Sequence, residues 1–262
     1  AQSFTRAIIV RPGCGYSYNN LGVTLKYQRK IIGAIDIFAK LTKLWPNSVE
    51  ALQNLAATLS LLKPDSFSQK LQRNYLEVLN RDGIVRPEEI SHSVIALLKC
   101  HEAITEAIQW TNKINIQPIG WKHCVVLSEI PLFLKIIELC PLQDIEIENV
   151  LKTLRKILLL ERARLSNNKR LINFQISLAL HCFTNEFVYE ETKEEKLAIK
   201  IMEKHLQTSV NRQDQVSPYL IACLASYRSL YRYPWITDIS SPELETLLKR
   251  QVKEVNQDLT TL

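Results

Sequence analysis

Residues 7–22, AIIVRPGCGYSYNNLG, recur in outline 34 residues further on, as LTKLWPNSVEALQNLA at 41–56. The two stretches share a proline, an asparagine, and a leucine followed by a small residue at the same places. The positions that match at this offset are Phe4 and Phe38, Ala7 and Leu41, Pro12 and Pro46, Tyr18 and Leu52, Asn20 and Asn54, Leu21-Gly22 and Leu55-Ala56, and Leu25 and Leu59. A constant period of this length indicates stacked repeats, each of which buries its apolar face against the next.

The residue types at the matched positions fit pairs of crossing helices. Gly22, Ala34 and Ala56 are small where two helices would cross closely, because a larger side chain would push the backbones apart. Pro46 cannot extend a helix and marks a turn. With Ala34 followed by Phe38 and Pro46, the period resembles the tetratricopeptide repeat. The resemblance covers residues 1 to about 62 and implies a final repeat helix at 2–11, a whole repeat at 15–46 and a further first helix at 49–62.

Beyond residue 62 the repeat loses its consensus, but helical spacing persists. In register, Ser68 and Gln72 stand where alanine and an aromatic residue belong. The stretch IPLFLKIIELC at 130–140 is apolar nearly all round and predicts a buried helix. No segment alternates with a period of two for long enough to predict a sheet. We therefore expect an all-α chain, with tetratricopeptide-type helical repeats at 1–82 and a non-consensus α-helical region at 83–262.

The composition limits which classes of partner and which cellular compartment can be expected. Hydrophobic residues make up 46% of the chain, and the net charge of +6 is too small to favour nucleic acid without a focused basic patch. No run of 18 apolar residues exists, so we expect no membrane partner. The six cysteines lack metal-type spacing, which favours free thiols in a cytoplasmic protein. Because the chain begins with Ala1 and has one methionine, Met202, we expect it to be part of a longer protein.

A second resemblance concerns the later part of the chain. The stretches LALHCFTNEFVYEET at 178–192 and ETLLKRQVKE at 245–254 resemble the region that precedes the catalytic domain in bacterial proteins joining tetratricopeptide repeats to a class I methyltransferase. The resemblance extends over residues 85–258. It implies that the chain is the non-catalytic, substrate-recruiting or regulatory part of such an enzyme.

The turn Gly13-Cys14-Gly15 has a competing interpretation. A strand followed by such glycines opens the cofactor loop of many S-adenosylmethionine-dependent methyltransferases, and Ala7–Val10 is apolar enough to be that strand. The cofactor loop also needs a second strand with an acidic residue near its end, which holds the ribose. Here the following residues fit repeat helices instead. We predict that the glycines form a turn between helices and that this chain has no catalytic or cofactor site.

Adjacent cysteine and histidine residues do not predict a metal site. Neighbours on a helix point about 100° apart, so each pair offers one ligand at best. The three pairs are Cys100-His101, His123-Cys124 and His181-Cys182. We predict no metal.

Two charged stretches lie in the second region. A basic one, from Lys152 to Arg170, contains Glu161 as its one counter-charge. It could meet phosphate or an acidic partner, but it lacks the interleaved aromatic residues that stack on bases. We expect a solvated helix face that runs into a polar loop at 166–168. An acidic stretch, from Glu186 to Glu195, is expected to be solvated except where Thr192 and Glu195 form a capping box.

The first helices of stacked repeats line a groove, and this groove is the predicted site. The side chains expected to face or border it are Tyr16, Asn19, Asn20, Tyr27, Gln53 and Asn54. Asn20 and Asn54 are equivalent, and a side-chain amide can both donate to a carbonyl and accept from an N–H, so the pair can bind a peptide backbone of any sequence. The same asparagines can instead bond to neighbouring helices.

The sequence therefore predicts a protein-interaction scaffold that binds an extended peptide or partner protein in the repeat groove. The alternative is the methyltransferase-associated role described above. Neither the identity of the partner nor the oligomeric state follows from the sequence.

Overall fold

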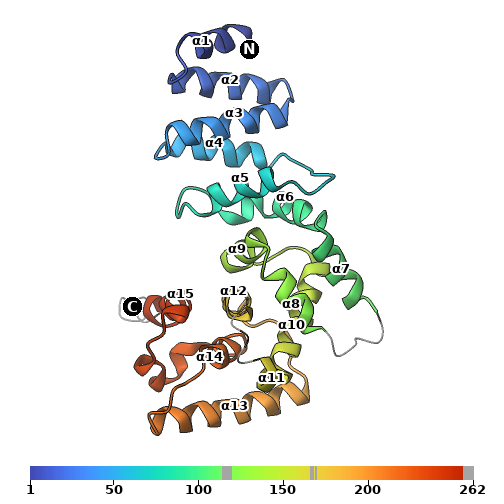
Figure 1. Cartoon of the computed structure of the whole chain (residues 1–262), viewed down its shortest axis with the longest axis vertical. Coiled ribbons are helices and arrows are strands. Elements are labelled where there is room, and N and C mark those ends of the chain that lie inside the picture. Colours follow the sequence, from blue (N-terminus) through green and yellow to red (C-terminus); the bar gives the residue numbers. More distant parts are fainter. Residues whose placement is uncertain (114–119, 166–167, 169, 256–262) are drawn as a thin grey trace. The chain divides into compact units, whose positions relative to one another are not determined.

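The computed structural model describes residues 1–113, 120–165, 168 and 170–255, and among these residues it contains helices and turns but no strand (Figure 1). The expected all-α class is confirmed for this part of the chain. The chain divides into two compact units, Ala1–His101 and Glu102–Leu262. The sequence predicts a boundary between residues 82 and 83, where the repeat consensus is lost. That boundary separates sequence patterns and not compact units, so it stays a prediction. Ser166, Asn167 and Lys169, which belong to the expected solvated face and loop, lie outside the described residues.

The first unit is built from successive helices that pack in chain order. They are α1 (Gln2–Val10), α2 (Gly15–Tyr27), α3 (Ile31–Leu44), α4 (Val49–Leu59), α5 (Gln69–Leu79) and α6 (Pro87–Lys99). Each helix packs on the next one along the chain, and α4 also contacts both α2 and α6. Figure 1 shows α1 to α4 as a stack that starts at the N-terminus.

The crossing of α2 and α3 explains why position 22 is glycine. A Cβ atom on Gly22 would lie 2.7 Å from two ring atoms of Phe38, closer than real side chains approach. Phe38 is fully buried, and so is Ala34 one turn earlier on the same helix. The expected close approach at the small residues is confirmed.

The stretch around the glycine turn is helical on both sides. Ala7–Val10 lies in α1, Cys14 has extended backbone angles and caps α2, and Gly15 is the first residue of α2. A Cβ atom on Gly15 would lie 2.4 Å from the indole of Trp45, so the helix start packs closely on this ring. The interpretation as a turn between helices is confirmed.

α5 departs from the repeat register because of its cap. The Ser68 hydroxyl accepts a hydrogen bond from the backbone N–H of Leu71 at 3.4 Å, so Ser68 ends a loop instead of packing in the core. The core position of this helix passes to Tyr75, which is fully buried and donates its hydroxyl hydrogen to the carbonyl of Leu59 at 3.2 Å. This accounts for the absence of an aromatic residue at position 72.

The second unit is also helical among its described residues. Its helices are α7 (Glu102–Thr111), α8 (Trp121–Leu127), α9 (Pro131–Leu139), α10 (Ile145–Leu160), α11 (Arg162–Leu165), α12 (Leu171–Thr184), α13 (Lys193–Asn211), α14 (Pro218–Ala225) and α15 (Glu245–Leu248). Short 3-10 turns η1 (Leu230–Arg232), η2 (Pro234–Asp238) and η3 (Pro242–Leu244) precede α15, and a π turn, η4 (Lys249–Lys253), follows it.

The centre of this unit is α12, which packs against α8, α9, α10, α14 and α15. α9 is buried as predicted, with Phe133 stacked on Phe174 of α12 at 6.4 Å between ring centroids. The predicted capping box at Thr192 and Glu195 is present at the start of α13.

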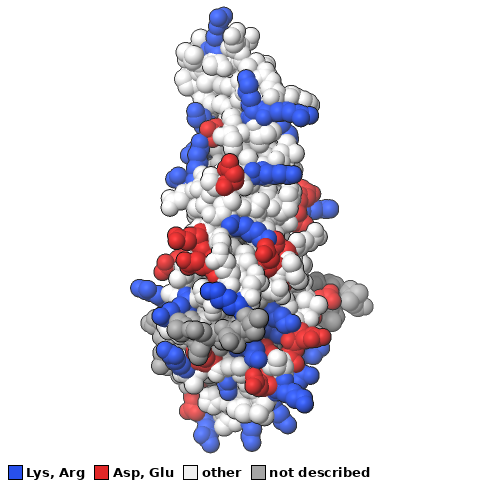
Figure 2. Space-filling model, turned by 90° about the vertical axis from the view of Figure 1, so that its right-hand side faces the viewer, with Lys and Arg blue, Asp and Glu red and all other residues white. Residues whose placement is uncertain are grey.

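The surface carries both signs of charge. On the face shown in Figure 2, Lys and Arg side chains are interspersed with Asp and Glu side chains. None of the helices in the described part of the chain combines the length and the hydropathy needed to cross a bilayer.

Candidate functional site

The predicted tyrosines lie on the outside of α2. Tyr16 is 75% exposed and meets Trp45 edge to face, with 5.7 Å between the ring centroids. Tyr27, the last residue of α2, is 86% exposed. Exposed aromatic rings of this kind supply contact area for a partner at little cost in side-chain entropy.

The predicted asparagines do not form a matched pair. The side-chain amide of Asn54 donates to Oδ1 of Asn19 at 2.9 Å, and the amide of Asn19 donates to a carboxylate oxygen of Glu50 at 2.9 Å. These bonds join α2 to α4, so two of the predicted side chains bridge helices. Asn20 is exposed, and its side chain has no hydrogen-bond partner among the described residues.

The 34-residue equivalence reappears in the main chain. The hydroxyl of Thr24 donates to the carbonyl of Asn20 at 2.7 Å, and the hydroxyl of Thr58 donates to the carbonyl of Asn54 at 2.6 Å. Each threonine lies four residues after its asparagine and bonds back along its own helix. α2 and α4 are therefore alike in backbone detail where their asparagine side chains differ.

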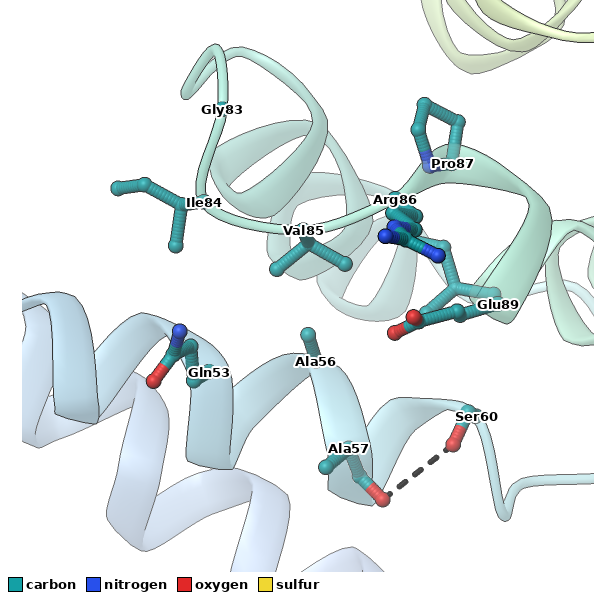
Figure 3. Close-up of a pocket in the computed structure, with 11 residues that line it drawn as sticks. Gln53, Ala56, Ala57, Ser60, Gly83, Ile84, Val85, Arg86, Pro87 and Glu89 are labelled. Carbon is teal, nitrogen blue, oxygen red and sulfur yellow. Dashed lines mark hydrogen bonds between the residues drawn. The ribbon is translucent and has the colours of Figure 1, made fainter.

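A groove with a volume of about 760 Å³ lies between α4 and the segment that enters α6 (Figure 3). Its lining residues are Gln53, Ala56, Ala57, Ser60, Gly83, Ile84, Val85, Arg86, Pro87, Glu89 and Ile90. In Figure 3 the side chains of Val85 and Glu89 point towards α4, and Ala56 points back across the groove. Gln53 is the one predicted site residue in this lining.

Small and apolar side chains form most of the groove's lining, and a few polar side chains complete it. Ala56 and Ala57 leave the surface of α4 open, opposite Ile84 and Val85. Gln53, Arg86 and Glu89 are exposed, and their side chains have no partner among the described hydrogen bonds and ion pairs. An apolar surface with a few free polar groups is typical of ligand grooves, and the volume lies in their usual range of about 300–1,000 Å³.

The wall opposite α4 also offers unused backbone donors. Gly83, in the loop between α5 and α6, has a positive φ of 74°, and Arg86 has extended angles (φ −77°, ψ 122°). The N–H groups of Val85 and Arg86 donate to no acceptor within the part of the chain that the structure describes. Exposed extended backbone of this kind can pair with a second extended chain.

Segment 83–87 is the part of the site that the sequence prediction missed. Its signals were a glycine after Asp82 and a proline at the first position of α6, which mark a turn and a helix start. These signals locate a loop, but they do not reveal that it lies opposite α4.

The second unit contains a buried ion pair that corrects the expectation of a solvated basic face at one residue, Arg155, whereas Lys152 and Arg164 are exposed as expected. Arg155 of α10 is 1% exposed, and its Nη2 lies 3.6 Å from a carboxylate oxygen of Glu195. The guanidinium also donates to the carbonyls of Tyr189 and Glu190 and lies 4.2 Å from the ring centroid of Tyr227. Aromatic faces and carbonyls replace part of the water that a buried charge loses. The Nε of Arg155 is buried and has no partner among the described residues.

The acidic stretch is likewise less solvated than predicted. Glu191 forms a bidentate ion pair with Arg228, one of whose bonds measures 3.1 Å. The hydrogen bonds and charge of Arg228 outweigh burial and hold the pKa of Glu191 below its usual value of 4.5. A groove of about 370 Å³ beside this stretch is lined by charges that are mostly paired, among them Lys156 with Glu194 at 3.3 Å.

Both ring nitrogens of the buried His181 have partners within the second unit. His181 is fully buried, with Nδ1 3.2 Å from the carbonyl of Ile137 and Nε2 3.3 Å from Glu148. Burial alone would raise the pKa of Glu148, but the hydrogen bonds from His181 and Tyr189 lower it overall. The arrangement fits a structural network, because every ring nitrogen and the Tyr189 hydroxyl have partners.

The adjacent cysteine–histidine pairs do not come together. None of the six cysteines forms a disulfide, and no group of three or more potential ligands among the described residues could hold a metal ion. Comparisons of the chain with protein-family models, curated proteins and solved structures found no match.

Proposed function

We propose that this chain is a protein-interaction scaffold that binds an extended peptide in the groove between α4 and segment 83–87. The observation that carries the proposal is the groove itself, which combines a small-residue surface on Ala56 and Ala57 with unpaired backbone donors at Val85 and Arg86. Apolar side chains of a peptide would lie on the alanines, and its carbonyls would accept from the free N–H groups.

We further propose that helices α1 to α4 are tetratricopeptide repeats. The 34-residue period and the close approach of Phe38 to Gly22 both support this assignment. The back-bonds from Thr24 and Thr58, which recur at the same period, support it independently of side-chain packing.

In this proposal the amide of Gln53 takes the role that the sequence prediction gave to the asparagine pair. Gln53 lines the groove and has both its donor and its acceptor free, whereas the amide nitrogen of Asn54 is used by Asn19. Asn20, Tyr16 and Tyr27 would contact a peptide that continues along α2.

The test begins with a selection of short random peptides on the immobilised chain, followed by titration of the selected peptides by fluorescence polarisation. Ala57→Trp fills the groove, and we expect it to weaken binding by at least about tenfold, as loss of a central pocket does. Gln53→Ala should weaken binding less, because one hydrogen bond contributes about 1 kcal/mol.

The matched control is Ala163→Trp, which adds the same side chain at an exposed helical alanine outside the groove. It should leave the affinity unchanged. Selected peptides that bind the Ala57→Trp variant as tightly as the unaltered chain would show that the groove is not their site.

A further inference from the structure

A second groove, separate from the proposed peptide site, lies between α3 and α5 in the first unit. It has a volume of about 690 Å³. Its lining residues are Asp36, Ala39, Lys40, Thr42, Lys43, Lys70, Arg73, Asn74, Leu76, Glu77 and Asn80. None of these residues belongs to the groove between α4 and segment 83–87.

The charges in this groove are unevenly satisfied. Both carboxylates are paired: Asp36 lies 2.5 Å from Nζ of Lys70, and Glu77 lies 3.5 Å from Arg81. Lys40, Lys43 and Arg73 have no carboxylate within 4.0 Å among the described residues. The groove therefore presents three uncompensated positive charges, although the net charge of the whole chain is only +6.

One wall of the groove also lacks a hydrogen-bond acceptor. The side-chain nitrogen of Asn74 is buried and has no partner among the described residues. A buried donor without an acceptor is costly, at about 1–3 kcal/mol. This nitrogen is closed off from solvent, so binding in the groove would rest on its charges.

We propose that this groove binds an acidic peptide segment of a partner protein. Its three free cations complement glutamate and aspartate side chains, and its methyl and methylene surfaces, from Ala39 and Leu76, suit a peptide between those charges. Nucleic acid fits less well, because no aromatic residue in the lining could stack on a base.

The test uses the full chain and a fluorescein-labelled peptide of alternating glutamate and alanine. The same peptide with glutamine in place of glutamate serves as the neutral probe. We expect the acidic peptide to bind at low salt, the neutral peptide not to bind, and the affinity to fall as salt is raised. The variant Lys40→Glu/Lys43→Glu/Arg73→Glu should weaken binding by at least about tenfold, because three attractions become repulsions.

The control variant Arg6→Glu/Lys26→Glu/Lys63→Glu makes the same change in net charge within the same unit but outside the groove. It should retain most of the affinity. Circular dichroism checks that both variants fold, and Lys40→Gln/Lys43→Gln/Arg73→Gln replaces the first variant if charge reversal unfolds it.

Three outcomes would overturn the proposal: no binding of the acidic peptide at low salt, equal loss of affinity in the groove and control variants, or tighter binding of a single-stranded oligonucleotide than of the acidic peptide. The second outcome would indicate attraction to net charge alone.

Discussion

At the scale of single residues, the fit of Gly22 against Phe38 controls how closely α2 and α3 pack. Alanine is a better helix former than glycine by about 1 kcal/mol, so Gly→Ala on a helix normally stabilises. At Gly22 the added methyl group would meet a fully buried ring at 2.7 Å. The steric term and the helix-propensity term therefore oppose each other at this position.

We expect Gly22→Ala to lower the free energy of unfolding by about 1–3 kcal/mol, the usual cost of overpacking. Gly33→Ala is the matched control, because its Cβ would lie 3.6 Å from Leu25, an ordinary contact. That variant should gain about 0.5–1 kcal/mol. Urea denaturation of the two variants measures both values, and a stabilised Gly22→Ala variant would contradict the close crossing.

Cys14 differs from the other cysteines in its chemistry. The hydroxyl of Ser17 donates to its sulfur at 3.3 Å, and this bond, with the nearby charge of Arg11, lowers the pKa of the thiol. Burial raises the pKa of Cys182 and of Cys223 to about 12. Since the thiolate is the reactive form, Cys14 should react first with iodoacetamide at about pH 8.

Mass spectrometry after brief alkylation identifies the labelled cysteine. Ser17→Ala removes the hydrogen bond and should slow the alkylation of Cys14 without exposing the buried thiols. Labelling of Cys182 as fast as Cys14 would be inconsistent with the buried core of the second unit.

At the scale of elements, the second unit depends on Arg155 to join α10 to the start of α13. Removing the cation leaves the Glu195 carboxylate buried without its counter-charge, although Tyr227 still donates to it at 2.8 Å. Breaking a buried pair from one side typically costs about 3–5 kcal/mol. We expect Arg155→Met to lose stability in this range and Arg155→Met/Glu195→Gln to recover part of it.

Lys156→Met is the control, because Lys156 lies on the same helix and its ion pair with Glu194 is exposed. It should change the free energy of unfolding by no more than about 0.5 kcal/mol. Equal losses for Arg155→Met and Lys156→Met in urea denaturation would contradict the buried role of Arg155.

The ion pair of Glu191 with Arg228 predicts a dependence on pH. The pKa of Glu191 is lower in the folded protein than its usual 4.5. The unfolded chain therefore takes up the proton first as the pH falls, so the stability from this pair is present above pH 4.5 and lost below it. Glu191→Gln should flatten the acid part of the stability profile, whereas Glu190→Gln, at an exposed position, should leave it unchanged.

At the scale of the whole molecule, the chain contains two compact units, and each should fold by itself. Residues 1–101 contain complete helices and their own core around Phe38, Leu55 and Tyr75. We expect the fragment 1–101 to give a helical circular-dichroism spectrum and a cooperative thermal transition. A fragment that is unfolded would show that the first unit depends on the second.

The period of 34 residues carried most of what could be predicted in the first unit. It placed helices at 2–11 and 49–62, close to the observed Gln2–Val10 and Val49–Leu59. It also selected Gln53, because repeats make the exposed face of α4 predictable. The place of segment 83–87 in this groove escaped prediction, since it comes from the return of the chain to α4, which no local pattern encodes.

The burial of a charged side chain was the second feature that could not be predicted from the sequence. Arg155 reads as one of several basic residues on a helix, and the groups that make its burial possible lie 34 to 72 residues later, from Tyr189 to Tyr227. Local sequence cannot distinguish such a residue from the exposed Lys152 or the half-exposed Lys156 beside it.

The contacts of Arg155 also bear on the order in which the elements of the second unit can come together. A chain in which α10 and α12 have come together before residues 189–195 arrive would hold a guanidinium that has lost water without gaining its carbonyls, its carboxylate or its aromatic rings. A buried charge without its partners is costly, so we expect such partly assembled forms to be unfavourable. We therefore expect the buried arginine to favour cooperative assembly of this unit.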